Sequence, residues 1–119
     1  GGLWALDAAT GKQIWYTPPP VPSCAGKQGC SGAQRSPPTV IPGAVIAPSM
    51  DGHIRAFRDT TGEIIWDFDA VKDYKTTNGI PGRGGSFSST GAVVVNGMLY
   101  INCGYSNMPG NVLLAFSLP

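Results

Sequence analysis

Apolar residues recur along the chain in short alternating stretches that are separated by turn residues. Two pairs of such stretches flank typical hairpin turns: residues 39–41 and 44–47 surround Pro42-Gly43, and residues 92–95 and 98–102 surround Asn96-Gly97. Alternation with a period of two places every second side chain on one face of a strand, and Asn-Gly favours a tight hairpin turn. The pattern therefore predicts an all-β chain of short antiparallel strands.

An internal repeat supports this prediction. Residues 3–15 align with residues 54–66 without a gap, at an offset of 51 residues. Each copy predicts a hairpin whose turn contains Thr-Gly, a hydroxyl group followed by a residue suited to positive φ, and whose second strand carries Ile and Trp. Residues 112–116 begin a third copy and stop before its Thr-Gly and Trp. The identical pairs are Ala5/Ala56, Thr10/Thr61, Gly11/Gly62, Ile14/Ile65 and Trp15/Trp66.

The repeat predicts a β-propeller. Its strands fall into groups of two, four and three, and a period of about 50 residues with four antiparallel strands per unit is typical of propeller blades. Residues 1–17 would form the end of one blade, 37–69 a full blade and 91–119 an incomplete blade. About two and a half blades leave unpaired strand edges and uncovered apolar faces. We therefore expect the chain to need the remaining blades, or another chain, to cover them.

Composition narrows the classes of partner. The chain has 8 Lys+Arg against 7 Asp+Glu among its 119 residues, a formal net charge of +1, which argues against nucleic-acid binding. The 17 Gly and 11 Pro fit many short strands joined by turns. No apolar run approaches the ~20 residues of a membrane span, so no span is expected. Residues 1–4 do not look like a secretory signal, so any signal was removed or lies upstream.

Cysteine spacing predicts a disulfide. Cys24 and Cys30 bracket a short polar segment with two glycines, which lets the loop curl back. Two free thiols, or half of a metal site, are the alternatives, but five intervening residues match no common zinc spacing. A disulfide favours an oxidising compartment, so we expect a periplasmic or secreted protein. Cys103 follows an apolar strand and is interpreted as a buried small residue.

A family motif overlaps the repeat. Residues 5–15 contain Ala-x-Asp-x-x-Thr-Gly-x-x-x-Trp, which resembles the tryptophan-docking motif of pyrroloquinoline quinone (PQQ) propellers. In the second copy Arg58 stands at the Asp position and Asp59 follows, so we expect the turn to be kept with a shifted polar contact. Segments 49–53, 82–86 and 102–117 further resemble the C-terminal blades of polyvinyl alcohol dehydrogenase-like quinoproteins, and the resemblance covers nearly the whole chain.

This resemblance implies a fold and a chemistry. It implies an eight-bladed propeller that holds PQQ and a calcium ion, oxidises a small or polymeric alcohol, and passes electrons to the quinone and then to a cytochrome. Cys24 and Cys30 are too far apart for the Cys-x-x-Cys-His motif of haem c, so any such haem would lie upstream. The chain would be a C-terminal fragment of such an enzyme.

Candidate cofactor residues lie in loops that a propeller would gather on one face: 18–37, 69–90, 103–111 and the turn 49–53. Arg35 could pair with a PQQ carboxylate, and the backbone around Gly84-Gly85 could approach an anion. A solvated loop cation and a flexible crossover are the respective alternatives. A surface aromatic beside Gly and Pro needs no ligand either. The candidate cofactor-binding residues are Gln34, Arg35, Gly85, Ser86, Tyr105, Asn107 and Met108.

Catalytic residues are not identified by the sequence. No cluster of oxygen ligands for calcium is visible, so no metal ligand is assigned and the catalytic base is expected in blades outside this chain. Asp51 is interpreted as a turn residue and His53 as a structural residue at a strand end. Trp15 and Trp66 are assigned to packing between blades, and Gly11 and Gly62 to the turns.

Two functions are compatible with these features. One is part of a PQQ-dependent alcohol dehydrogenase similar to polyvinyl alcohol dehydrogenase. The other is a non-catalytic propeller that acts as a protein-interaction scaffold in the cell envelope, because a fold does not determine a function. Long Gly-rich loops and a bridged Cys24–Cys30 pair favour the enzyme.

Overall fold

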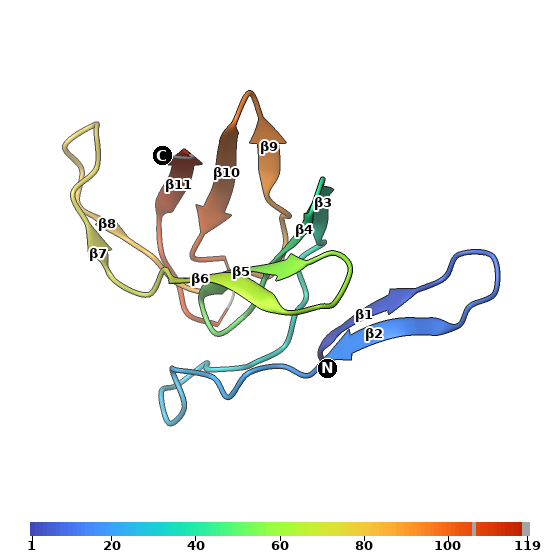
Figure 1. Ribbon diagram of the computed structural model, residues 1–119. Coiled ribbons are helices and arrows are strands. Elements are labelled where there is room, and N and C mark those ends of the chain that lie inside the picture. The colour runs from blue at the N-terminus through green and yellow to red at the C-terminus, as the bar shows by residue number, and fades with distance from the viewer. Residues whose placement is uncertain (106, 118–119) are drawn as a thin grey trace.

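Short antiparallel strands account for all regular secondary structure in the computed structural model, which describes residues 1–105 and 107–117 (Figure 1). The all-β prediction is confirmed for this part of the chain. Within it, no helix is long and apolar enough to cross a membrane. The strands are β1 (Leu3–Leu6), β2 (Gln13–Thr17), β3 (Thr39–Ile41), β4 (Ala44–Pro48), β5 (His53–Arg58), β6 (Ile64–Asp69), β7 (Asp73–Tyr74), β8 (Gly82–Arg83), β9 (Val93–Val95), β10 (Met98–Cys103) and β11 (Val112–Ser117).

A four-stranded antiparallel sheet, β3-β4-β5-β6, lies at the centre of the chain. Each strand follows its neighbour in sequence, because tight turns with positive φ at Gly43, Gly52 and Gly62 reverse the chain. Its strands match the predicted ones at 39–41 and 44–47 and in the repeat 54–66 to within one to three residues. The sheet runs from Thr39 to Asp69, within segment 37–69.

A three-stranded sheet, β9-β10-β11, packs against one face of the central sheet (Figure 1). Asn96 and Gly97 both have positive φ, 49° and 73°, as the predicted Asn-Gly hairpin requires. Trp66 and Phe68 from β6 meet Phe116 from β11 edge to face, with ring centroids 5.3 and 4.9 Å apart. The buried core between the two sheets comprises Ile46, Ile54, Ala56, Ala70, Phe87, Ala92, Ile101, Cys103, Val112 and Leu114.

The β1–β2 hairpin carries the first repeat copy and lies beside the β5–β6 turn of the central sheet (Figure 1). Trp15 is 8% exposed, and its indole N–H donates to the Asp59 carbonyl oxygen at 2.8 Å. A Cβ atom on Gly62 would come within 2.5 Å of the Trp15 ring, so the close approach requires glycine. The indole of one hairpin is therefore seated on the turn of the next hairpin.

Both repeat turns keep the same backbone hydrogen bonds despite their different side chains. In the first, Asp7 accepts from the Thr10 hydroxyl and backbone N–H, and these bonds hold the pKa of Asp7 below its usual value. In the second, Arg58 pairs with Glu63 at 3.2 Å, and Asp59 accepts from the Gly43 N–H. The expected shift of the polar contact is confirmed.

One small sheet was not expected from the sequence. Strands β7 and β8 pair within segment 69–90, for which the sequence predicts a loop. Each has only two residues, too few for an alternating pattern to be recognisable.

Candidate functional site

Backbone hydrogen bonds join the four segments that the sequence analysis placed on one face. The Met50 N–H donates to the Ala33 carbonyl, and the Phe87 N–H donates to the Ser49 carbonyl. The Gly104 N–H donates to the Ser86 carbonyl, and the Asn111 N–H donates to the Arg83 carbonyl. The described parts of segments 18–37, 49–53, 69–90 and 103–111 are thus neighbours in space.

A buried ion pair lies beneath this surface. Arg55 in β5 is 3% exposed and its guanidinium is 2.8 Å from the carboxylate of Asp51, which is 1% exposed. Arg55 also donates to the Ser49 hydroxyl at 2.9 Å. Burial raises the pKa of Asp51, but the hydrogen bonds from Arg55 and Ser49 and the positive charge of Arg55 outweigh it, so the pKa lies below its usual value. Asp51 also accepts the backbone N–H of His53, as a turn residue does.

Gln34 and Arg35 differ in exposure. Arg35 is exposed and Gln34 half-buried. The side-chain oxygens of Gln34 and of the nearby Ser36 are buried and have no hydrogen-bond partner in the part of the chain that the structure describes. A buried polar oxygen without a partner is costly, so the Gln34 oxygen needs a donor, and the Ser36 hydroxyl a donor or an acceptor, from outside these residues. The segment around Arg35 therefore contains two buried oxygens that lack a hydrogen-bond partner among the described residues.

Gly85 and Ser86 are held by internal contacts. The N–H groups of residues 84–86 donate to the Lys72 carbonyl, the Cys103 sulfur and the Met108 carbonyl. The fully buried Ser86 hydroxyl donates to the Met50 carbonyl and accepts from the Met108 N–H. A Cβ on Gly85 would lie 2.1 Å from the Met108 carbonyl oxygen. The N–H groups of residues 84–86 therefore already have acceptors. Because Gly85 has no side chain, its backbone can lie directly against that of Met108.

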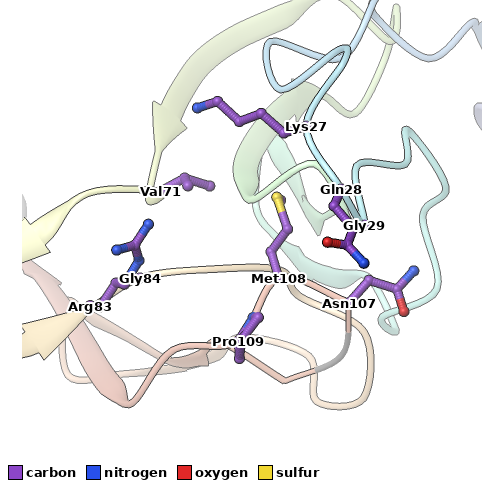
Figure 2. A pocket seen from close by; sticks show the side chains of 9 residues that line it. All are labelled: Lys27, Gln28, Gly29, Val71, Arg83, Gly84, Asn107, Met108 and Pro109. Carbon is purple, nitrogen blue, oxygen red and sulfur yellow. The ribbon is translucent and has the colours of Figure 1, made fainter.

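Tyr105, Asn107 and Met108 differ in exposure and surroundings. Tyr105 is 57% exposed, and Met108 is 8% exposed. Asn107 and Met108 line an open pocket of about 850 Å³ (Figure 2). Figure 2 shows Met108 extending into the space between Arg83 and Val71 on one side and Gln28 on the other. Of the candidate residues, only these two line this pocket.

The predicted disulfide between Cys24 and Cys30 is confirmed, with the two Cα atoms 5.6 Å apart. It closes a loop that supplies Lys27, Gln28 and Gly29 to the pocket wall. A Cβ on Gly29 would lie 2.5 Å from the Asn107 carbonyl oxygen, so the loop rests directly on segment 107–109. The bridge therefore holds one wall of the pocket.

Two basic residues of this pocket are not among the candidate residues predicted from the sequence. Lys27 and Arg83 both line it, and among the described residues neither forms an ion pair with a carboxylate. Positive charge without a partner favours an anionic group. The only signal in the sequence was that each basic residue lies in a Gly-rich loop.

Cys103 lies at the base of the site and is buried, as predicted. Burial raises the pKa of its thiol, and the thiol donates to the Gly85 carbonyl oxygen at 3.2 Å. Burial also raises the pKa of Tyr74 to about 12. Neither group ionises near neutral pH, so neither is suited to be a nucleophile or base there.

The described residues do not fit a calcium site. No group of three or more His, Cys, Asp or Glu side chains in this part of the chain could hold a metal ion. Calcium prefers six to eight oxygen ligands, and the buried carboxylate of Asp51 is already paired with Arg55. No chemical step is therefore assigned to a metal here.

Comparison with known proteins finds similarity to alcohol dehydrogenases, although no protein-family model matches the sequence. It is 39% identical to polyvinylalcohol dehydrogenase of Sphingopyxis sp. (strain 113P3), and the match covers 98% of this chain and 20% of that enzyme. A polyvinylalcohol dehydrogenase of Pseudomonas sp. is 35% identical, with the same coverage. The quinohemoprotein alcohol dehydrogenase ADH-IIG of Pseudomonas putida is 34% identical over 86% of this chain and 13% of that enzyme.

These matches extend over nearly all of the chain and include the repeat and the segments that form the candidate site. The chain spans about a fifth of the length of the two polyvinylalcohol dehydrogenases. It belongs to the family of PQQ-type alcohol dehydrogenases that includes the polyvinylalcohol dehydrogenases.

Proposed function

We propose that this chain is part of a longer PQQ-dependent alcohol dehydrogenase that oxidises small or polymeric alcohols. The observation that carries the proposal is the 39% identity to a polyvinylalcohol dehydrogenase across 98% of the chain. Because the chain spans only 20% of that enzyme, activity is a property of the longer protein. The confirmed disulfide supports a periplasmic or secreted location.

The proposed architecture is a β-propeller. The four-stranded meander β3-β4-β5-β6 has the form of one blade, β1–β2 that of the end of the preceding blade, and β9-β10-β11 that of the start of the next. The contact between Trp15 and the Asp59 carbonyl supports this arrangement, because it joins consecutive sheets in the way a docking motif does. Eight blades are proposed from the family resemblance.

The chain would contribute one sector of the cofactor-binding surface. PQQ, when bound, supplies the electron sink for alcohol oxidation, and a cytochrome is the proposed acceptor. Arg35 is proposed to pair with a carboxylate of the cofactor, since a guanidinium binds carboxylates through two parallel hydrogen bonds. The unpartnered oxygens of Gln34 and Ser36 beside it support a ligand or a further segment at this position. Gly85, Ser86 and Met108 would support that surface through their backbone contacts, and Tyr105 and Asn107 would border it.

Titration of the full-length protein with PQQ and calcium, followed by dye-linked alcohol oxidation, tests the proposal. Saturable binding with activity is expected. Arg35→Met should weaken PQQ binding about tenfold, or about 1.4 kcal/mol, because one charge-assisted interaction is lost. Lys12→Met is the matched control, because Lys12 is an exposed cation in the β1–β2 turn, away from the loop segments.

Two results would count against the proposal. A full-length protein that binds no PQQ would be a scaffold propeller that only resembles the enzymes. Equal PQQ affinity in Arg35→Met and Lys12→Met would remove Arg35 from the cofactor site while leaving the dehydrogenase function in place.

A further inference from the structure

A hydrogen-bonded chain of Ser, His and Asp lies outside the residues discussed so far as a cofactor site. The Ser23 hydroxyl oxygen is 2.7 Å from Nε2 of His53, and Nδ1 of His53 is 2.6 Å from Oδ1 of Asp67. Ser23 directly precedes the disulfide loop, His53 begins β5 and Asp67 belongs to β6. Folding thus brings together three residues that no local sequence motif links.

The direction of these hydrogen bonds follows from the chemistry of the groups. An ionised carboxylate only accepts hydrogen bonds, so Nδ1 of a neutral His53 must carry the ring proton and donate it to Asp67. Nε2 then has a free electron pair and accepts the Ser23 hydroxyl proton. This is the polarity in which an imidazole acts as a base toward a serine hydroxyl.

Asp67 is itself fixed in place. Its second oxygen accepts from Nε of Arg55 at 3.1 Å, and Arg55 is anchored by its ion pair with the buried Asp51. The Asp69 carboxylate lies 3.8 Å from Nε2 of His53. Each ring nitrogen of His53 therefore has a carboxylate oxygen nearby, that of Asp67 at Nδ1 and that of Asp69 at Nε2.

Ser23 and His53 differ in their exposure to solvent. Ser23 is exposed, whereas the His53 side chain is only 12% exposed. Cys24, the residue after Ser23, is buried and bridged to Cys30, so the disulfide limits the movement of the serine backbone. A substrate can approach the hydroxyl from solvent while the imidazole stays shielded behind it.

We propose that Ser23, His53 and Asp67 form a nucleophilic centre that hydrolyses carboxylic esters. The Ser23 oxygen would bond to the ester carbonyl carbon while its proton passes to Nε2 of His53. The alcohol leaves with that proton as the carbon–oxygen ester bond breaks, and an acyl group remains on Ser23. Water then attacks the acyl group, His53 takes a proton from this water and returns it to Ser23, and the carboxylic acid is released.

The substrate class is an ester of an aliphatic alcohol. Hydrolysis of such an ester releases an alcohol, which the proposed dehydrogenase consumes, so this choice of substrate rests on the proposed function. The nucleophilic centre itself rests only on the geometry of the three residues. Ester hydrolysis needs no quinone, and the two activities can therefore be measured separately in one preparation.

The first test is covalent labelling of the full-length protein, without PQQ, by diisopropyl fluorophosphate. Peptide mapping by mass spectrometry should locate the label on Ser23, and the labelled protein should lose p-nitrophenyl acetate hydrolysis. This readout needs no variant and so does not depend on a variant's folding. Failure of Ser23 to react would overturn the proposal and leave the three residues as a structural tether between segment 18–37 and β5.

Variants provide the second test. Ser23→Ala should lower kcat for p-nitrophenyl acetate at least about 100-fold, the scale of a lost nucleophile or base. Ser89→Ala changes an exposed serine outside the Ser23–His53–Asp67 hydrogen bonds, so it is the matched control and should keep the rate. PQQ-dependent alcohol oxidation should be unchanged in Ser23→Ala. An unchanged ester rate in Ser23→Ala would contradict the proposal, whatever the outcome for alcohol oxidation.

Asp67 is a positioning residue, and its test separates positioning from folding. Asp67→Asn should lower kcat for the ester with little change in KM, because the amide no longer fixes the ring tautomer. Asp67→Glu should recover part of kcat, since a carboxylate is restored. Equal kcat values in Asp67→Asn and the unmodified protein would exclude the role assigned to this residue.

Discussion

At the scale of single residues, the buried pair of Arg55 and Asp51 is the most consequential contact. Both side chains are almost completely inaccessible to solvent, and Arg55 also bonds to Ser49 and Asp67. A buried charge pair adds little net stability compared with apolar residues of the same size, but loss of one partner leaves a charge buried without compensation. The pair therefore makes the site sensitive to substitution.

Arg55→Met should lower the free energy of unfolding of the full-length protein by about 3–5 kcal/mol, because Asp51 stays buried without its partner. Urea denaturation measures this change. The matched control is Arg58→Met, three residues along the same strand, where the pair with Glu63 is exposed. That change should cost less than about 1 kcal/mol, and equal losses in the two variants would contradict the structure.

Cys103 should resist alkylation in the native protein. Its thiol is 1% exposed, and burial raises its pKa, so both access and thiolate population are low. Iodoacetamide at pH 8 should modify Cys103 only after the protein is unfolded in urea, as followed by mass spectrometry. Rapid alkylation of Cys103 under native conditions would show that the packing around Gly85 is open.

Features of single residues could be predicted where the signal lay in neighbouring residues of the sequence. The Cys24–Cys30 bridge and the buried Cys103 followed from spacing and from an apolar context, and both are confirmed. The partners of Arg55 did not follow, because Arg55 alternates with the apolar residues Ile54 and Ala56 in the sequence and only the tertiary structure shows that it is buried. The contact of Ser23 with His53 was missed for the same reason, since it joins residues from separate elements.

At the scale of elements, turns were the most predictable feature. Asn96-Gly97 and the two Thr-Gly turns have the positive φ values that their residues favour, and the strands on either side follow. The small β7–β8 sheet could not be found, because two-residue strands carry no period. Loops with long-range partners, such as segment 18–37, were recognised only as loops.

Removal of the disulfide by Cys24→Ser with Cys30→Ser should lower the free energy of unfolding by about 2 kcal/mol, because a short closed loop restricts the unfolded chain. Denaturation of the full-length protein with and without the substitutions measures the loss. The loop also supplies Lys27 and Gln28 to the pocket wall, so proteolysis within segment 24–30 should become faster. No change in either measurement would mean that the loop is held by its other contacts alone.

Gly85→Ala should displace the backbone of segment 84–86 or of Met108, because the added Cβ would lie 2.1 Å from a carbonyl oxygen. A loss of about 1–3 kcal/mol is expected for such overpacking, measured by chemical denaturation. Gly79→Ala is the control: its φ is +77°, but no atom lies within 4 Å of the new Cβ. A smaller loss at Gly85 than at Gly79 would contradict the close backbone approach.

At the scale of the whole molecule, the two ends of the described chain differ in how much apolar surface they leave exposed. The central and three-stranded sheets share a core, whereas the β1–β2 hairpin leaves Trp4, Leu6 and Ile14 more than half exposed. Exposed apolar surface of this kind normally lies against another part of a protein. Sequence periodicity predicted these sheets and their order but could not show what covers the hairpin.

The 119-residue chain produced alone should therefore associate with itself. Sedimentation velocity should show oligomers or aggregates, and the dye ANS should bind the exposed apolar faces, in contrast to the full-length protein. The physical reason is the uncovered face of β1–β2. A stable monomer that binds no ANS would contradict this expectation.

The seating of Trp15 on the turn that contains Asp59 and Gly62 has a thermodynamic consequence. Such a contact couples a sheet only to its immediate neighbour, so the sheets of the proposed propeller would behave as a one-dimensional nearest-neighbour system. A substitution that destabilises one sheet would weaken its contacts with its two neighbours, and its effect on stability would fall with distance along the array. Fraying then starts at whichever sheet lacks a neighbour, and closure of the array into a ring removes that starting point.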